Sequence, residues 1–145
     1  LDVITRAIKK ENCGKALLDD IERLHDEASA CPGQLKSILK NKMVRAVKFA
    51  TTVASNSANE FECRRASAGL YNAKTATLLA TEGAKLGAEG GDARRLILSR
   101  LVLDFRLTAK DPLALEESEF QKEAAKLLIS DAPVDLDKAI HLTSL

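Results

Sequence analysis

About fifty residues in the middle of the chain contain almost nothing that would end a helix. From Gln34 to Gly83 there is no proline, and Gly69 is the only glycine inside the stretch. Proline lacks the amide hydrogen that a helix needs, and glycine weakens a helix interior, so this stretch favours long helices. Serine and asparagine side chains compete for backbone hydrogen bonds near residues 55–57. Two alternatives therefore stand: one long helix, or two helices separated at that point.

Apolar residues recur at helical spacing through this stretch. Its first half places on one face Leu35, Ile38, Leu39, Met43, Ala46, Ala50, Val53, Ala54 and Ser57. Its second half predicts another buried stripe, made of Ala68, Tyr71, Thr75, Leu78 and Leu79. Because small side chains let helix axes approach closely, we expect this part of the chain to lie in the middle of a bundle.

Composition extends the helical prediction to the whole chain. Aromatic residues make up 3% of the 145 residues, whereas sheets draw on aromatic and β-branched side chains. Alanine, leucine, lysine, arginine and glutamate are abundant and favour helices. With 46% apolar residues the chain can bury a core, yet no apolar run approaches the roughly 18–20 residues of a membrane span. We expect one all-α domain over residues 1–145, a bundle of about five to seven helices.

Turn-forming residues place the remaining helix ends. Breaks are expected at residues 12–14 and 31–33, with a helix between them whose apolar face is Leu17, Leu18, Ile21, Leu24 and Ala28. Four glycines at residues 83–91 predict a loop, and Asp92 is expected to cap the next helix. That helix, residues 96–107, is apolar nearly all round and is predicted to be the most buried.

Two further helices are expected near the C-terminus. Asp111-Pro112 is predicted to end the preceding helix and to start another, which buries Phe120, Ala124, Leu127 and Leu128. After Ala132-Pro133, a short last helix is predicted to turn inward Val134, Leu136, Ala139 and Ile140.

The charge pattern contains one candidate binding surface. The chain has 22 basic and 21 acidic residues, so its net charge of +1 gives no strong attraction to nucleic acid or to an anionic membrane. Residues 34–49, however, contain no acid and carry Lys36, Lys40, Lys42, Arg45 and Lys48. Such a basic helix can bind nucleic-acid phosphates, an anionic surface or a partner protein. The alternative is a solvated face that packs near the acidic run of residues 116–123 (Glu116, Glu117, Glu119 and Glu123).

No combination of residues predicts catalysis, a bound cofactor or a metal site in this chain. His25 and His141 are far apart, and neither has a second ligand at metal-binding spacing. Cys13, Cys31 and Cys63 are odd in number and irregularly spaced, which favours reduced thiols in an intracellular compartment, the cytoplasm or an organelle matrix. Because the chain opens with Leu1, we expect a processed product or a piece of a longer protein.

Two stretches resemble a known family. Residues 1–11 (LDVITRAIKKE) and 16–22 (ALLDDIE) are similar to the acyl-CoA dehydrogenase family, specifically its alkylation-response branch. There an "LDVLRAL" helix closes the helical flavin domain and a helical tail follows. Residues 68–73 (AGLYNA), 91–96 (GDARRL) and 105–107 (FRL) also resemble that tail. The resemblance implies that residues 1–30 end a flavoprotein helical domain and that residues 34–145 form its C-terminal helical tail.

The resemblance also implies a function. Enzymes of this family bind FAD and remove an α-proton from an acyl-CoA thioester with a glutamate, but the matching segments lie upstream of this chain. The chain is then a non-catalytic C-terminal segment for packing and subunit association. Its partners are the remainder of a flavoprotein or other subunits, including a second copy, and FAD belongs to the parent protein. In the alkylation-response branch the tail is linked to DNA binding through basic residues, for which residues 34–49 are the candidate.

Two other functions stay open from the residues alone. One is an independent helical interaction module that uses the basic helix Leu35–Phe49, with weak nucleic-acid binding as one form of it. The other is a small lipid carrier in which the apolar helix Leu96–Leu107 lines a cavity.

Overall fold

The computed structural model contains helices and no strands in the residues that it describes, which are 3–56, 59–111, 113 and 118–144. Six α-helices and two short π-helical segments follow one another in the order η1 (Val3–Ile8), α1 (Cys13–Glu27), α2 (Gly33–Ser55), α3 (Glu60–Ala88), α4 (Arg94–Val102), η2 (Leu103–Leu107), α5 (Glu119–Ile129) and α6 (Leu136–Thr143). Because η2 continues α4, the described chain has seven separate helices. The prediction of an all-α bundle of about five to seven helices is confirmed.

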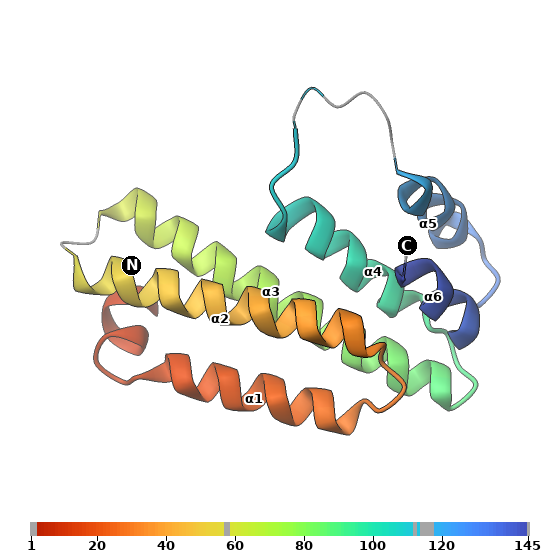
Figure 1. Cartoon of the computed structure of the whole chain (residues 1–145), viewed down its shortest axis with the longest axis horizontal. Helices are drawn as coiled ribbons and strands as arrows, with labels where there is room; N and C mark the ends of the chain where they lie inside the picture. Colours follow the sequence, from red (N-terminus) through yellow and green to blue (C-terminus); the bar gives the residue numbers. More distant parts are fainter. Residues whose placement is uncertain (1–2, 57–58, 112, 114–117, 145) are drawn as a thin grey trace.

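The two longest helices, α2 and α3, lie side by side as an antiparallel hairpin along the length of the molecule (Figure 1). Helix α1 runs along one side of this hairpin, and η1 packs beside it near the tip. Helix α4 packs along the second half of α3, with α5 and α6 against α4 at the far end. No helix in the described part of the chain is long and apolar enough to cross a membrane.

The central stretch forms two helices rather than one. Helix α2 ends at Ser55, where the hydroxyl of Ser55 donates to the carbonyl of Thr51. Helix α3 begins at Glu60, and the side-chain oxygen of Asn59 caps it by accepting from the amide of Glu62. The two-helix alternative is therefore correct, although Ser57 itself lies outside the described residues.

Buried side chains form two clusters along α2 and α3. At the tip, Ile4 and Ile8 of η1 and Ile21 of α1 pack with Met43 and Val53 of α2. At the other end, Leu35 and Leu39 of α2 pack with residues of α3 to α6, among them Leu96, Ile97, Phe120, Ala124 and Leu142. Helix α3 contributes mainly alanines to both clusters, so its neighbours approach it closely. The expectation that this stretch lies in the middle of the bundle is confirmed.

The buried face of α3 is not the one predicted. Ala68, Tyr71 and Leu78 are exposed, with Tyr71 at 70% of its full accessibility. The helix instead buries a face of small residues, which comprises Cys63, Ala66, Leu70, Ala73, Ala76, Thr77, Ala80, Thr81, Gly83 and Ala84. Apolar periodicity predicts that the face with the larger apolar side chains is buried. Close packing of helices instead requires small side chains at the contact. The rest of the helix therefore points its larger residues outward.

The sequence predicts a loop over residues 83–91, but residues 83–88 form the last turns of α3. A Cβ atom at Gly83 would lie 2.3 Å from the backbone nitrogen of Leu96. At Gly87 it would lie 2.9 Å from the Cβ of Ala93. These two glycines therefore provide space for the crossing of α3 and α4 rather than a flexible turn. The turn itself is confined to the residues around Gly90, whose φ of 79° is left-handed.

Asp92 acts at the start of α4, although the cap position belongs to Ala93. The Asp92 carboxylate accepts from the amide of Arg94 and from the amide of Val134, which lies just before α6. The amide of Ala93 also donates to the carbonyl of Val134 (2.8 Å). The turn between α3 and α4 is thus joined to the turn between α5 and α6.

The helix predicted to be the most buried is buried along one side only. Leu96 and Ile97 are fully buried and Leu103 is nearly so, whereas Phe105 is 59% exposed. Apolar residues lie all round this helix, but α3, α5 and α6 cover only part of its surface.

The sequence predicts that the next helix starts at Asp111-Pro112, and for Asp111, which the structure describes, this is wrong. Asp111 does not cap a helix there, since its carboxylate accepts from the amide of Leu113 and α5 begins at Glu119. Pro112 lies outside the described residues. Ser118 and Gln121 form a reciprocal capping box at the start of α5, and Asp135 caps α6. The inward faces of both helices are as predicted, with Leu142 and Thr143 added to that of α6.

Candidate interaction surface

Three of the five basic side chains predicted as one surface are engaged within the fold. Lys36 donates to the backbone carbonyl of His25 (2.7 Å), and Lys40 pairs with Glu22 (2.6 Å), both on α1. Lys42 turns the other way and donates to the carbonyl of Leu107 at the end of η2 (2.7 Å). These lysines join neighbouring helices, and they are not all free to meet a ligand.

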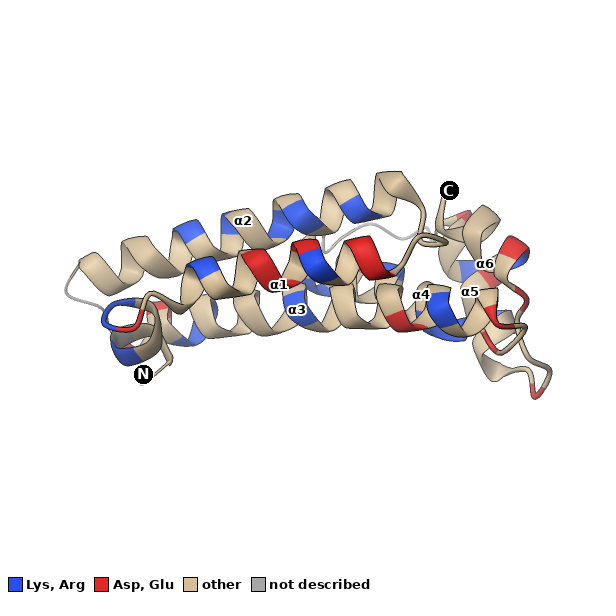
Figure 2. Ribbon diagram, turned by 90° about the horizontal axis from the view of Figure 1, so that it is seen from below, with Lys and Arg blue, Asp and Glu red and all other residues tan. Residues whose placement is uncertain are grey.

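The other two, Arg45 and Lys48, are exposed and have no charged or hydrogen-bonding partner among the described residues. Figure 2 shows the basic residues distributed along α2 and the acidic residues gathered on α1. In the alternative of a solvated face, the basic helix packs near the acidic run of residues 116–123. The carboxylate that pairs with this helix is instead Glu22 of α1, and Glu123 pairs with Lys126 on its own helix. Glu116 and Glu117 lie outside the described residues.

Beside Arg45 and Lys48 lies a cluster that the sequence did not predict. The guanidinium of Arg65 on α3 lies 5.5 Å from the ring centroid of Phe49 on α2 and 5.8 Å from that of Phe61. Phe49 is 37% exposed and Phe61 is 69% exposed. We call these three residues the aromatic–arginine cluster. The one available signal is that two of only four phenylalanines lie on either side of the possible break at residues 55–57.

The cluster lies near the tip of the α2–α3 hairpin, with Phe49 on α2 and with Phe61 and Arg65 on α3. An open hollow of about 330 Å³ lies next to it, lined by Glu60, Phe61 and Arg64. Rings and guanidinium groups that stay in contact with each other and with solvent are typical of protein-binding surfaces. The arrangement can therefore bind a partner through apolar contact and charge.

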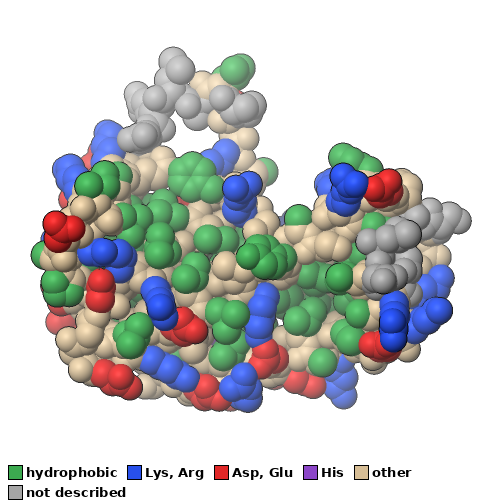
Figure 3. Space-filling model, turned by 180° about the vertical axis from the view of Figure 1, so that it is seen from behind, with side chains coloured by type: hydrophobic (Ala, Val, Ile, Leu, Met, Phe, Trp, Pro, Cys, Tyr) green, Lys and Arg blue, Asp and Glu red, His purple; other side chains and the backbone are tan. Residues whose placement is uncertain are grey.

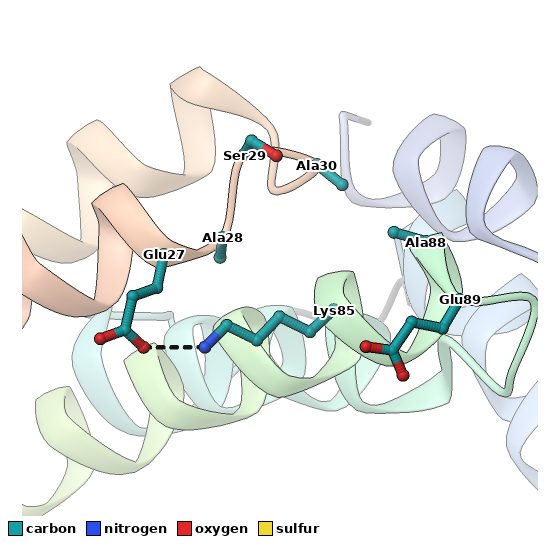
Figure 4. Close-up of a pocket in the computed structure, with 7 residues that line it drawn as sticks. All are labelled: Glu27, Ala28, Ser29, Ala30, Lys85, Ala88 and Glu89. Atoms are coloured by element: carbon teal, nitrogen blue, oxygen red, sulfur yellow. Dashed lines mark hydrogen bonds and ion pairs between the residues drawn. The ribbon is translucent and has the colours of Figure 1, made fainter.

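A second hollow lies between the end of α1 and the end of α3 (Figure 4). Its volume is about 180 Å³, and its lining includes Glu27, Lys85 and Glu89. Lys85 donates to Glu27 (2.8 Å), and this bond, together with one from Arg23, lowers the pKa of the Glu27 carboxyl. Two of the charges that line this hollow, Glu27 and Lys85, are thus already paired across α1 and α3.

A third hollow, of about 230 Å³, lies between α5 and α6 and includes Glu123, Lys138 and His141. Sites for drug-sized ligands and cofactors usually measure about 300–1,000 Å³ and enclose most of the ligand. Two of these three hollows are smaller than that, and the third, beside Phe61, is open to solvent. None is lined by the apolar helix Leu96–Leu107, whose buried side chains pack directly against neighbouring helices.

The histidines and cysteines are dispersed. His25 is buried beside α2, and burial lowers the pKa of its imidazole, as do the charges of Lys36 and Lys40. Cys31 and Cys63 are buried free thiols and Cys13 is partly exposed. Burial raises the pKa of Cys31 to about 11. Over the described residues, no group of three or more histidine, cysteine, aspartate or glutamate side chains could hold a metal ion.

Comparison with known proteins adds no relative to this description. No family model, no curated protein and no solved structure matches the chain.

Proposed function

We propose that this chain is a non-catalytic helical segment that serves packing and subunit association. The resemblance of residues 1–22 to the end of the acyl-CoA dehydrogenase flavin domain supports a role as the C-terminal helical region of such a flavoprotein. The observation that carries the proposal is the aromatic–arginine cluster, which exposes two phenylalanine rings around one guanidinium at the hairpin tip.

The chemistry of the cluster indicates the kind of partner. Exposed aromatic rings lose unfavourable contact with water when a protein covers them, and aromatic and arginine side chains are enriched among residues that dominate interfaces. Arg45 and Lys48 border the cluster and need carboxylates opposite them once water is excluded. The partner surface is therefore apolar at its centre and acidic at its edge.

A peptide probe tests this assignment. The probe is a fluorescent helical peptide with leucines on one face and glutamates beside them, and its control has lysines in place of the glutamates. We expect saturable binding of the acidic peptide and at least tenfold weaker binding of the basic one, in line with about 1.4 kcal/mol per factor of ten. Phe61→Ala and Arg65→Ala should each weaken binding, because both remove contact area at the centre of the surface.

Lys122→Ala is the matched control, because Lys122 is an exposed cation paired with Glu119 on the distant helix α5. It should leave binding unchanged. Equal binding of the two peptides, or insensitivity to both cluster substitutions, would refute the assignment. The non-catalytic role has its own test, a titration with FAD and with an acyl-CoA. Stoichiometric binding of flavin by this chain would contradict it.

A further inference from the structure

Helix α3 carries an exposed stripe on the side that faces away from α2. The stripe consists of Arg64, Ala68, Tyr71, Thr75, Leu78 and Glu82, all of them exposed except Thr75, which is half-buried. Tyr71 is 70% exposed and Leu78 is 36% exposed, although both are among the larger apolar side chains of the helix. Figure 3 shows the molecule from the side of α3, where hydrophobic side chains are exposed among charged ones. The intramolecular packing leaves this face uncovered.

The spacing of the stripe is symmetric. Its six positions are separated by four, three, four, three and four residues, which is the spacing of a helix–helix seam. The same sequence of intervals is read from either end. Two antiparallel copies of α3 can therefore meet with all six positions aligned, about a two-fold axis at residue 73.

The side chains are complementary in this register. Arg64 of one copy meets Glu82 of the other, which pairs opposite charges at both ends of the seam. Ala68 meets Leu78 and Tyr71 meets Thr75, so a small side chain faces a large one in every inner layer. A parallel pair would instead place Tyr71 against Tyr71 and Arg64 against Arg64. We propose that a second copy of this chain docks antiparallel on the α3 stripe and forms a two-fold symmetric dimer.

The charged residues around the seam agree with this register. Within one chain Arg64 pairs with Glu60, and Glu82 pairs with Arg95 of α4 (both 2.5 Å). Adding the second copy extends each pair into a row of alternating sign, in which Arg64 lies between two glutamates and Glu82 lies between two arginines. Neither residue has to give up its present partner.

The dimer is expected to be weak. From residue 64 to residue 82 the helix rises about 27 Å, at 1.5 Å per residue, so a single helix pair buries less than the ~800 Å² per partner of a standard interface. We expect dissociation in the micromolar range. The stripe shares no residue with the aromatic–arginine cluster, although Arg64 also lines the hollow beside it. Glu82 lies at the other end of the stripe, so its variant tests this inference independently of the proposed function.

Mixing two charge variants tests the register. Arg64→Glu places glutamates opposite each other in its own dimer, and Glu82→Arg places arginines opposite each other in its own. Each variant alone should dimerise at least about tenfold more weakly than the unaltered chain. A one-to-one mixture should restore dimerisation, because both ends of the mixed dimer then pair opposite charges. Sedimentation velocity over about 1 µM to 1 mM would measure this, with circular dichroism to show that both variants are folded.

Lys122→Glu serves as the control, since it reverses an exposed charge on α5 away from the stripe. It should dimerise like the unaltered chain. A folded protein that stays monomeric throughout the concentration range would overturn the proposal. Failure of the mixture to restore dimerisation would also overturn it, because the antiparallel register pairs opposite charges at both ends of the mixed dimer. Equal dimerisation of the unaltered chain and the two single variants would overturn the antiparallel register, because in a parallel pair like charges already meet in the unaltered chain.

Discussion

Gly83 is the position at which α3 and α4 come closest, and replacing it with alanine tests whether that contact sets the fold. The added Cβ would lie 2.3 Å from the nitrogen of Leu96, 2.9 Å from the carbonyl carbon of Arg95 and 3.0 Å from the Cα of Leu96. Ordinary contacts begin near 3.4 Å, so the two backbones must separate by about 1 Å. Because all three neighbours are backbone atoms, no side-chain rotation can relieve the overlap.

The magnitude follows from two opposing effects. Overpacking a close contact costs about 1–3 kcal/mol, and contact with backbone lies at the upper end of that range. Alanine is a better helix former than glycine by about 1 kcal/mol. Gly83→Ala should therefore lower the free energy of unfolding by about 2 kcal/mol, which corresponds to about 4–8 °C in Tm for a chain of this size.

Gly33→Ala is the matched control. Gly33 is the first residue of α2, and a Cβ there meets nothing within 4 Å. It should be neutral or should stabilise by up to about 1 kcal/mol. Urea unfolding followed by circular dichroism at 222 nm would measure both variants. If Gly83→Ala proved as stable as Gly33→Ala, the close crossing of α3 and α4 would be refuted.

Three further predictions concern ionisable groups. Hydrogen bonds from Val134 and Arg94 outweigh the effect of partial burial and lower the pKa of Asp92 below its usual 3.8. Asp92→Ala should therefore lower the free energy of unfolding, measured with urea at neutral pH, by about 1–3 kcal/mol. The stabilisation by Asp92 should disappear as the pH falls below about 4. The lowered pKa of His25 means that the unfolded chain takes up its proton first, so stability should fall as the pH drops through 6.5, and His25→Gln should flatten that part of a stability–pH profile. With its pKa raised to about 11, buried Cys31 should resist alkylation at pH 8 until the chain unfolds, whereas Cys13 should be labelled first in a time course read by mass spectrometry.

Periodicity identified the buried faces where apolar and polar residues are clearly separated. On α1 it found Ile21 and Leu24, and on α5 it found Phe120 and Ala124. It failed on α3 because alanine contributes a weak hydrophobic signal and the larger Tyr71 dominated the pattern. Only the approach of neighbouring helices determines that the alanine face is the buried one.

The sequence predicts a loop at the glycines near residue 87, where the structure has the end of α3, for a related reason. A glycine permits unusual backbone angles and also close approach, and the sequence does not distinguish the two uses. Gly90 serves the first use, with a positive φ, and Gly83 serves the second. The partner that reveals the difference, Leu96, lies beyond the turn.

The candidate surface could be predicted only in part. The sequence located the basic residues of α2, but it could not show that Lys40 meets Glu22 or that Lys42 reaches the carbonyl of Leu107. Each of those contacts depends on the packing of two helices. The aromatic–arginine cluster was missed because Phe49 and Arg65 meet only in the antiparallel register of α2 and α3.

The two buried clusters share α2 and α3, and on α3 the division between them falls within a single turn. Ala73 belongs to the cluster at the tip and Ala76 to the cluster at the other end. Amide protons in this turn should exchange with solvent most slowly, because exposing them requires both ends of the molecule to open together. Fraying of η1 and α1, or of α5 and α6, should stop before it reaches this turn. The chain would then open as two subglobular units with a common rigid centre.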